Sequence, residues 1–167
     1  EVDTVEGRAG DFEVTLTRKP RYVNEDLCTG CTVCTEYCPI PVPDLFNQGL
    51  SDNKAIHIYF SQAVPLVPYI DKQCRFLEDE KCTICESVCK NKAIDLRQKP
   101  EKVVVKVGAI VLSPGYGVFD PRLRGDYGYG KIENVVTSLD FERLLCATGP
   151  HEGEILRPSD KTHPKKV

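Results

Sequence analysis

The sequence predicts an α+β fold in which a cysteine-rich region separates β-rich segments. Three observations support this prediction. Eight closely spaced cysteines lie between residues 28 and 89. Residues 11–18 before them and 101–107 after them have the composition of strands. A short amphipathic helix is expected later in the chain, over residues 138–147.

The first cysteine run reads CTGCTVCTEYCP from residue 28 to residue 39. Three thiols at two-residue gaps, a fourth after three residues and then a proline form the spacing of bacterial ferredoxins. A short loop can place Cys28, Cys31 and Cys34 at three corners of one [4Fe–4S] cube. Cys38 lies on the following helical turn, where it reaches a different cube. Pro39 ends this turn, because proline cannot continue the hydrogen-bond ladder.

Four further thiols can complete the two sites. Cys74, Cys82, Cys85 and Cys89 are separated by gaps of seven, two and three residues. The long gap after Cys74, and Lys90 in place of the usual proline, depart from the compact motif. The same crossover predicts that each cube takes one ligand from the other motif. The first cube is assigned Cys28, Cys31, Cys34 and Cys89, and the second is assigned Cys38, Cys74, Cys82 and Cys85.

Two other uses of these cysteines are open. Zinc also takes four thiolates, but zinc fingers usually present two C-x2-C pairs with a longer spacer. A disulfide framework is possible for any even set of cysteines. The first residues, EVDTVEGRAGD, do not resemble an apolar secretory signal. Closely spaced thiols suit metal better than bridges in a reducing cytosol, so a cytoplasmic location is expected.

Composition limits the classes of function. The 167 residues can form one domain or two small ones, and the net charge of −3 disfavours nucleic acid as a partner. No run approaches the 18 apolar residues of a membrane span. An acidic protein suits docking to a basic redox partner. The chain has no methionine and begins with Glu1, which favours a piece of a larger protein.

Local patterns predict the elements around the cysteines. Residues 54–60 alternate apolar and polar, residues 83–89 suit a short helix, and residues 93–96 suit a short strand. Cysteine loop, helix and strand then recur in a ferredoxin-like, pseudo-twofold plan. Its halves are separated by an insertion over about residues 40–70, which is expected to pack against something because structureless loops of that length are uncommon.

The second half of the chain holds no cluster motif. Residues 108–113, GAIVLS, are nearly continuously apolar and predict a strand buried on both faces. Thr137 and Asp140 can form a capping box for the helix over residues 138–147. Cys146 on that helix is expected to be a core or partly exposed thiol. The isolated histidines and the Gly-rich run RGDYGYGKI are not expected to form ligand sites.

Four segments resemble the A subunit of heterodisulfide reductase, an iron–sulfur flavoprotein family that works in flavin-based electron bifurcation. They are KPRYVNEDLCTGCTVCTEYCP, KAIHIYFSQAVPLVPYID, VGAIVLSPGYGVFD and YGYGKIENVVTSLDFERLLCATGP. The resemblance covers nearly the whole chain. It implies two [4Fe–4S] clusters here, FAD in the full-length protein, and other redox subunits as partners.

The resemblance also implies a ferredoxin-like 2[4Fe–4S] domain inserted into a partial thioredoxin-reductase-like FAD-domain sheet. Residues 1–19 would precede the insertion, residues 20–98 would form it, and residues 99–167 would resume the FAD domain. If so, the strands over residues 12–18 and 103–107 should pair. Gly115 and Tyr116 are candidate flavin contacts, although Ser-Pro-Gly replaces the usual Ala-Thr-Gly there. No Gly-rich dinucleotide fingerprint occurs in the chain.

These observations favour an electron-relay segment of an oxidoreductase subunit. A free-standing dicluster electron carrier is the alternative, but it would not need the strand and helix beyond residue 99. A structural metal-binding module is the third hypothesis, and iron content would separate it from the other two.

Overall fold

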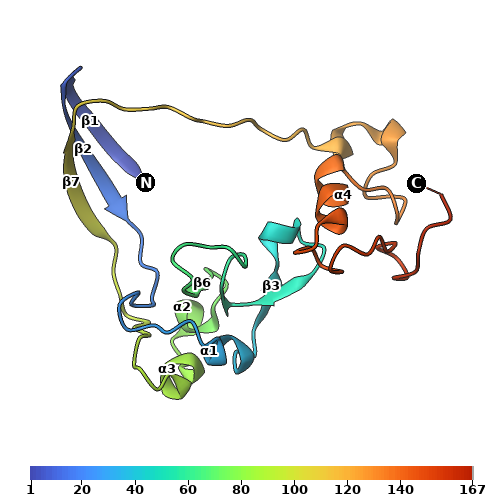
Figure 1. Cartoon of the computed structure of the whole chain (residues 1–167), viewed down its shortest axis with the longest axis horizontal. Helices are drawn as coiled ribbons and strands as arrows, with labels where there is room; N and C mark the ends of the chain where they lie inside the picture. Colours follow the sequence, from blue (N-terminus) through green and yellow to red (C-terminus); the bar gives the residue numbers. More distant parts are fainter. Residues whose placement is uncertain (167) are drawn as a thin grey trace.

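The computed structural model describes residues 1–166 (Figure 1). A three-stranded sheet lies at one end of the molecule, and the chain leads from it into the cysteine-rich region (Figure 1). An extended segment leads from the sheet to a third region around helix α4 (Figure 1). No helix among the described residues is long and apolar enough to cross a bilayer.

The sheet consists of β1 (Val2–Arg8), β2 (Asp11–Arg18) and β7 (Glu101–Val107), in the order β1-β2-β7 with both pairs antiparallel. Its β2–β7 register places Phe12 opposite Val107 and Leu16 opposite Val103. The predicted pairing of the two strands that flank the cysteines is therefore confirmed. Strand β1 was not predicted, and all of its residues are exposed.

A tight turn joins β1 to β2. Gly7 near the end of β1 and Gly10 within the turn have φ angles of +100° and +92°. A Cβ on Gly7 would lie 2.2 Å from the backbone oxygen of Asp11, so this position requires glycine. The turn lets β1 fold back along β2 with backbone hydrogen bonds.

The cysteine-rich region is built from short elements around one core. Val23 and Ile94 form an isolated antiparallel bridge near its two ends, where a strand over residues 93–96 was expected. Its apolar centre includes Val42, Ile56 and Phe76, each at most 6% exposed. The region contains α1 (Val33–Glu36), β3 (Pro41–Pro43), η1 (Leu45–Asn47), β4 (Asp52–Lys54), β5 (Ile56–His57), β6 (Tyr69–Ile70), α2 (Arg75–Asp79) and α3 (Ile84–Val88).

Two elements predicted for this region are present in part. The helix predicted over residues 83–89 is α3. In the alternating run of residues 54–60, Lys54 ends β4 and only Ile56–His57 (β5) follows as strand, because the chain bends at residues 59–60. Strand β5 pairs with β6, and β3 pairs with β4, so the sheets here are two-stranded.

The insertion over about residues 40–70 does pack against another part of the chain. Phe46 stacks on Phe60 with 4.9 Å between ring centroids. The Arg143 guanidinium of α4 (Ser138–Leu145) lies 4.3 Å from the Phe46 centroid, and its Nε donates a hydrogen bond to Asn47 Oδ1 at 3.1 Å. This cation–π contact joins the third region to the cysteine-rich region.

Helix α4 begins at the predicted capping box. The Thr137 side chain accepts a hydrogen bond from the Asp140 N–H at 3.1 Å, and the Asp140 carboxylate accepts one from the Thr137 N–H at 2.8 Å. The helix ends at Leu145, two residues earlier than predicted, with Cys146 as its C-cap. Two single turns, η2 (Pro121–Leu123) and η3 (Gly125–Tyr127), precede it.

The strand predicted over residues 108–113 is wrong for this structure. These residues are extended without strand pairing, and Val111 and Leu112 are 88% and 85% exposed. A hydrogen bond from the Gly10 N–H to the Gly108 carbonyl at 2.9 Å ties the start of the run to the sheet. A strand needs a neighbour for its N–H and C=O groups, and no strand within residues 1–166 lies beside this run.

Candidate metal centre

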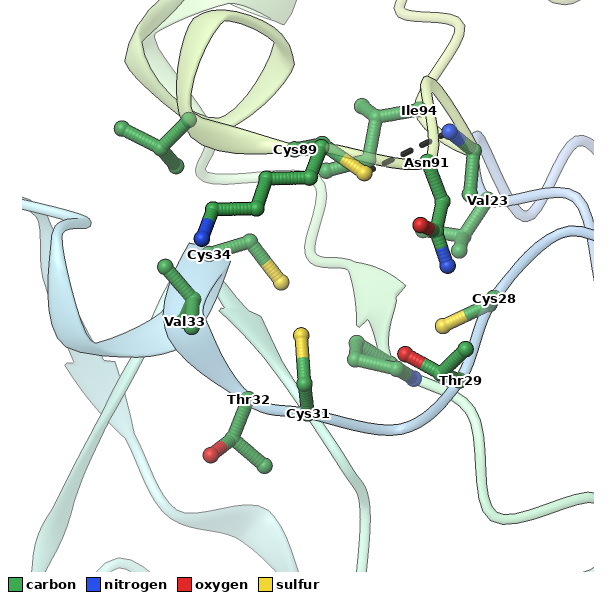
Figure 2. Close-up of a pocket in the computed structure, with 14 residues that line it drawn as sticks. Val23, Cys28, Thr29, Cys31, Thr32, Val33, Cys34, Cys89, Asn91 and Ile94 are labelled. Atoms are coloured by element: carbon green, nitrogen blue, oxygen red, sulfur yellow. Dashed lines mark hydrogen bonds between the residues drawn. The ribbon is translucent and has the colours of Figure 1, made fainter.

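Four thiols surround a cavity of about 250 Å³ between α1 and α3. They are Cys28, Cys31, Cys34 and Cys89, named here the first thiol group. Figure 2 shows these four side chains approaching the same space from the loop before α1, from α1 itself and from the end of α3. The volume exceeds that of a single water or metal ion many times over.

The other four thiols line a separate cavity, and they are named the second thiol group. Cys38, Cys74, Cys82 and Cys85 meet there with a ring of apolar side chains. This second cavity is only about 10 Å³, so a metal–sulfur group could enter only if the thiols separated. The structure thus brings together the same two sets of four that the crossover predicts, while ligation itself stays a prediction.

Short helices and tight loops bring the thiols of each group together. Gly30 has a φ of +69° within the first loop, and a Cβ there would lie 3.0 Å from the Leu66 oxygen. Helix α1 carries Cys34, and Cys89 is the C-cap of α3. The gap of seven residues after Cys74 is occupied by the five-residue helix α2, for which Cys74 is the N-cap. The departure from the compact motif therefore has a structural cause.

Backbone N–H groups already point at sulfurs of the first thiol group. The Gly30 N–H donates to Cys28 Sγ at 3.4 Å, and the Ala93 N–H donates to Cys89 Sγ at 3.3 Å. Such donors stabilise a thiolate, which is the form that binds metal. The Thr35 hydroxyl next to Cys34 is buried without a hydrogen-bond partner. The donors and the thiols together fit a metal–sulfur group at this cavity.

Burial opposes ionisation of several of these thiols. It raises the pKa of Cys34 and of Cys74, although backbone N–H groups on the following turn partly oppose the rise. Burial and the nearby Cys74 thiol raise the pKa of Cys85 to about 12. A cation that binds these sulfurs would have to displace their protons and compensate the buried negative charge. Within residues 1–166, no three His, Cys, Asp or Glu side chains are grouped as ligands of a single ion.

The candidate flavin contacts lie far along the exposed segment. Tyr116 is 82% exposed, and Gly115 has a φ of +70° with open space around it. Tyr116 borders a surface hollow of about 540 Å³ together with Phe119 and Tyr129. No flavin contact follows from this geometry alone, so the assignment stays a prediction.

His57 has a structural place in the core. It is 4% exposed, its Nδ1 lies 2.6 Å from the Lys54 carbonyl oxygen, and its Nε2 lies 3.0 Å from the Tyr69 hydroxyl. Both ring nitrogens therefore have partners. Sequence reasoning gave less weight to two polar residues at the rim of the first cavity, Lys90 and Asn91. The missing proline after Cys89 was the available signal for Lys90.

Cys146 lies at the end of α4, outside both thiol groups. Its Sγ is 3.5 Å from the Thr148 hydroxyl, which holds the pKa of this thiol below its usual value. Arg143 Nη2 donates to the same hydroxyl oxygen at 3.3 Å, which leaves the hydroxyl proton free for the sulfur. The environment favours thiolate without making Cys146 a ligand.

We therefore expect iodoacetamide to alkylate Cys146 in the intact protein. Thr148→Val should move the pH profile of this reaction to higher pH, because the thiolate loses its hydrogen bond and the pKa rises. At a fixed pH below that pKa, the rate should fall. Thr148→Ser keeps the hydroxyl and should keep the profile. Mass spectrometry of the labelled peptide measures the rate, and an unchanged Thr148→Val profile would contradict the assignment.

Comparison with known proteins identifies the relatives of the chain. No protein-family model matches it. It is 48% identical over 167 residues to the iron–sulfur A subunit of the CoB–CoM heterodisulfide reductase of Methanocaldococcus jannaschii. It is 43% identical over 167 residues to the A subunit of the H(2):CoB-CoM heterodisulfide,ferredoxin reductase of Methanothermobacter thermautotrophicus. Along its whole length the chain is homologous to the A subunit of heterodisulfide reductase.

This homology confirms the resemblance found in the sequence. A third relative, the A subunit of the ferredoxin:CoB-CoM heterodisulfide reductase of Methanosarcina acetivorans, is 46% identical over 96% of the chain. The chain spans about a quarter of the length of the first two relatives, 25% in each case, and 20% of the third. The chain therefore matches one region of each of these longer subunits. The name of the M. jannaschii relative describes an iron–sulfur subunit.

Proposed function

We propose that the chain is an electron-relay segment of a flavin/iron–sulfur oxidoreductase of the kind formed by the A subunit of heterodisulfide reductase. The observation that carries the proposal is the sorting of eight thiols into two groups of four within one core. The names of the relatives also support it, because they describe reductase subunits and, in one case, an iron–sulfur subunit. Residues 20–98 would hold two [4Fe–4S] clusters, one in each thiol group, and other redox subunits would be its partners.

The residues of the chain have distinct tasks in such a relay. The thiolates hold the clusters, and the N–H groups of Gly30 and Ala93 stabilise sulfur charge in the first group. Ile40, Ile56 and Ile70 exclude water from the second. When bound, a [4Fe–4S] cluster accepts and releases one electron at a time at a potential set by its surroundings. The chain needs no acid–base residue for this task.

We further propose that this ferredoxin-like region is inserted in the sheet of an FAD domain. Residues 1–19 and 99–167 would be parts of that domain, with Gly115 and Tyr116 near the flavin of the full-length protein. The β2–β7 pairing supports the proposal, since both strands flank the cysteine-rich region. The exposed apolar residues Val111 and Leu112 also support it, because such a run is suited to burial in a larger domain.

Iron and acid-labile sulfide analysis tests the cluster proposal. The protein purified without oxygen should contain close to eight of each per chain, and Cys146→Ser should leave both values unchanged. About four would mean that the second thiol group forms no cluster. Zinc without sulfide would refute the relay and favour a structural metal module.

A free-standing dicluster carrier is the alternative function. The two candidates differ in how the region beyond residue 99 is used. A carrier would exchange electrons with a soluble donor and acceptor without it. Deleting the chain beyond residue 107 should leave the clusters of a carrier and its electron exchange intact, whereas a relay segment should lose exchange with the flavin of the full-length protein.

A further inference from the structure

The two motifs place different residues directly after their last cysteine. Cys38 is followed by Pro39, and Cys89 is followed by Lys90. Because of the crossover, Pro39 lines the second cavity and Lys90 lines the first. The position after the last cysteine of a motif is therefore a proline at the second thiol group and a lysine at the first.

The other lining residues also make the first cavity more polar than the second. Beside its thiols, the second cavity is lined only by proline and isoleucine side chains. The first cavity also has an apolar part, formed by residues such as Val23 and Ile94, but the polar residues Thr29, Thr32 and Asn91 line it as well. Burial differs as well, since Cys31 in the first group is exposed, whereas Cys38, Cys74 and Cys85 in the second are buried.

Lys90 is placed to stabilise negative charge at the first cavity without being a metal ligand. It is an exposed residue that nevertheless lines the first cavity, so its aliphatic stem covers the site while its ammonium group stays in water. Asn91 is already engaged, because its amide donates to the Leu27 carbonyl at 3.1 Å. Among the described residues that line this cavity, Lys90 is therefore the one that adds a full positive charge.

We propose that the two centres have different reduction potentials, and that Lys90 raises the potential of the first above that of the second. The proposal rests on the proposed function, because both thiol groups must hold [4Fe–4S] clusters. Reduction adds one negative charge to a cluster. A nearby cation and polar groups in the lining favour this charge, whereas a wholly apolar lining disfavours it.

The difference gives the relay a direction within the chain. With both clusters bound, one electron passing from the second centre to the first would oxidise one cluster and reduce the other, with no proton transferred. The electron would then lie at the thiol group that includes the exposed Cys31. Lys90 would act by stabilising the added negative charge.

Redox titration followed by electron paramagnetic resonance tests the proposal on the whole protein, with dithionite as the reductant. The wild type should show two midpoint potentials. Lys90→Gln should lower the higher one, so that the ratio of reduced to oxidised first centre at fixed potential falls roughly tenfold, or about 59 mV for one electron. Lys90→Arg keeps the charge and should restore the wild-type value.

Two further variants make the result specific. Lys92→Gln removes the same charge two residues away, from a residue that does not line the cavity, and should leave both potentials unchanged. Pro39→Lys places a cation at the second cavity and should raise the lower potential. Equal midpoints in the wild type, or equal shifts for Lys90→Gln and Lys92→Gln, would overturn the proposal. Iron and sulfide near eight in each variant show that such a failure concerns Lys90, whereas a wild type without them refutes the proposed function itself.

Discussion

Replacing Cys89 by serine should alter the first centre, and replacing Cys38 should alter the second. In the sequence, Cys38 belongs to the first motif and Cys89 to the second, whereas the structure places Cys89 with Cys28 and Cys38 with Cys74. Each replacement leaves three thiolates on one cluster, so we expect loss of one iron or a changed spectrum for that cluster alone. This is the largest effect that a single side chain of the region should have.

A third cysteine variant tests whether Cys89 belongs to the first thiol group. Cys28→Ser should reproduce the spectrum of Cys89→Ser, because both belong to the first thiol group. Electron paramagnetic resonance and iron analysis of the reduced proteins provide the comparison, and Cys146→Ser is the control for a thiol outside both groups. If Cys38→Ser instead reproduced Cys28→Ser, the crossover between the motifs would be wrong.

Removing the metal should unfold the cysteine-rich region. Four of the fourteen buried residues in its core are cysteines, namely Cys34, Cys38, Cys74 and Cys85. Its helices have four or five residues, which are too short to be stable alone. Clusters that bind the folded region but not the unfolded chain would contribute their binding free energy to folding.

Amide hydrogen exchange before and after anaerobic chelation measures this effect. The Asp71 N–H donates to the Ala55 carbonyl at 2.7 Å, and the Ala55 N–H donates to the Ile40 carbonyl at 2.9 Å. Protection of these two amides should fall to the level of an unfolded chain. The β2–β7 pairs provide an internal reference, since no thiol lies in these strands. Retained protection at Ala55 without metal would show that the apolar core is sufficient for folding.

Local patterns predicted the elements whose stability is decided locally. The capping box of Thr137 and Asp140 needs only a three-residue spacing, and it is present. Strands β2 and β7 have apolar and β-branched residues, and both are present. The sorting of the thiols could also be predicted, because the gaps place Cys28, Cys31 and Cys34 in one short loop and the ferredoxin-type crossover assigns Cys89 to them.

Elements that depend on partners far away in the sequence were harder to predict. Residues 108–113 have the composition of a buried strand, but composition cannot supply the neighbour that a strand requires. Strand β1 gave little signal, because none of its side chains is buried and no apolar face is needed. The contact between Arg143 and Phe46 joins residues nearly a hundred positions apart, and neither residue indicates the other in the sequence.

The register of β2 and β7 brings the two ends of the cysteine-rich region together. Arg18 and Glu101 lie opposite each other and form an ion pair, so the chain leaves and re-enters the sheet at one point. Topologically, residues 19–100 are the loop of a β-hairpin. The entropy of closing a loop grows only with the logarithm of its length, so a loop of this size is little harder to close than a modest one. A redox centre attached in this way could be acquired, exchanged or lost as a cassette while the hairpin that carries it kept the same hydrogen bonds.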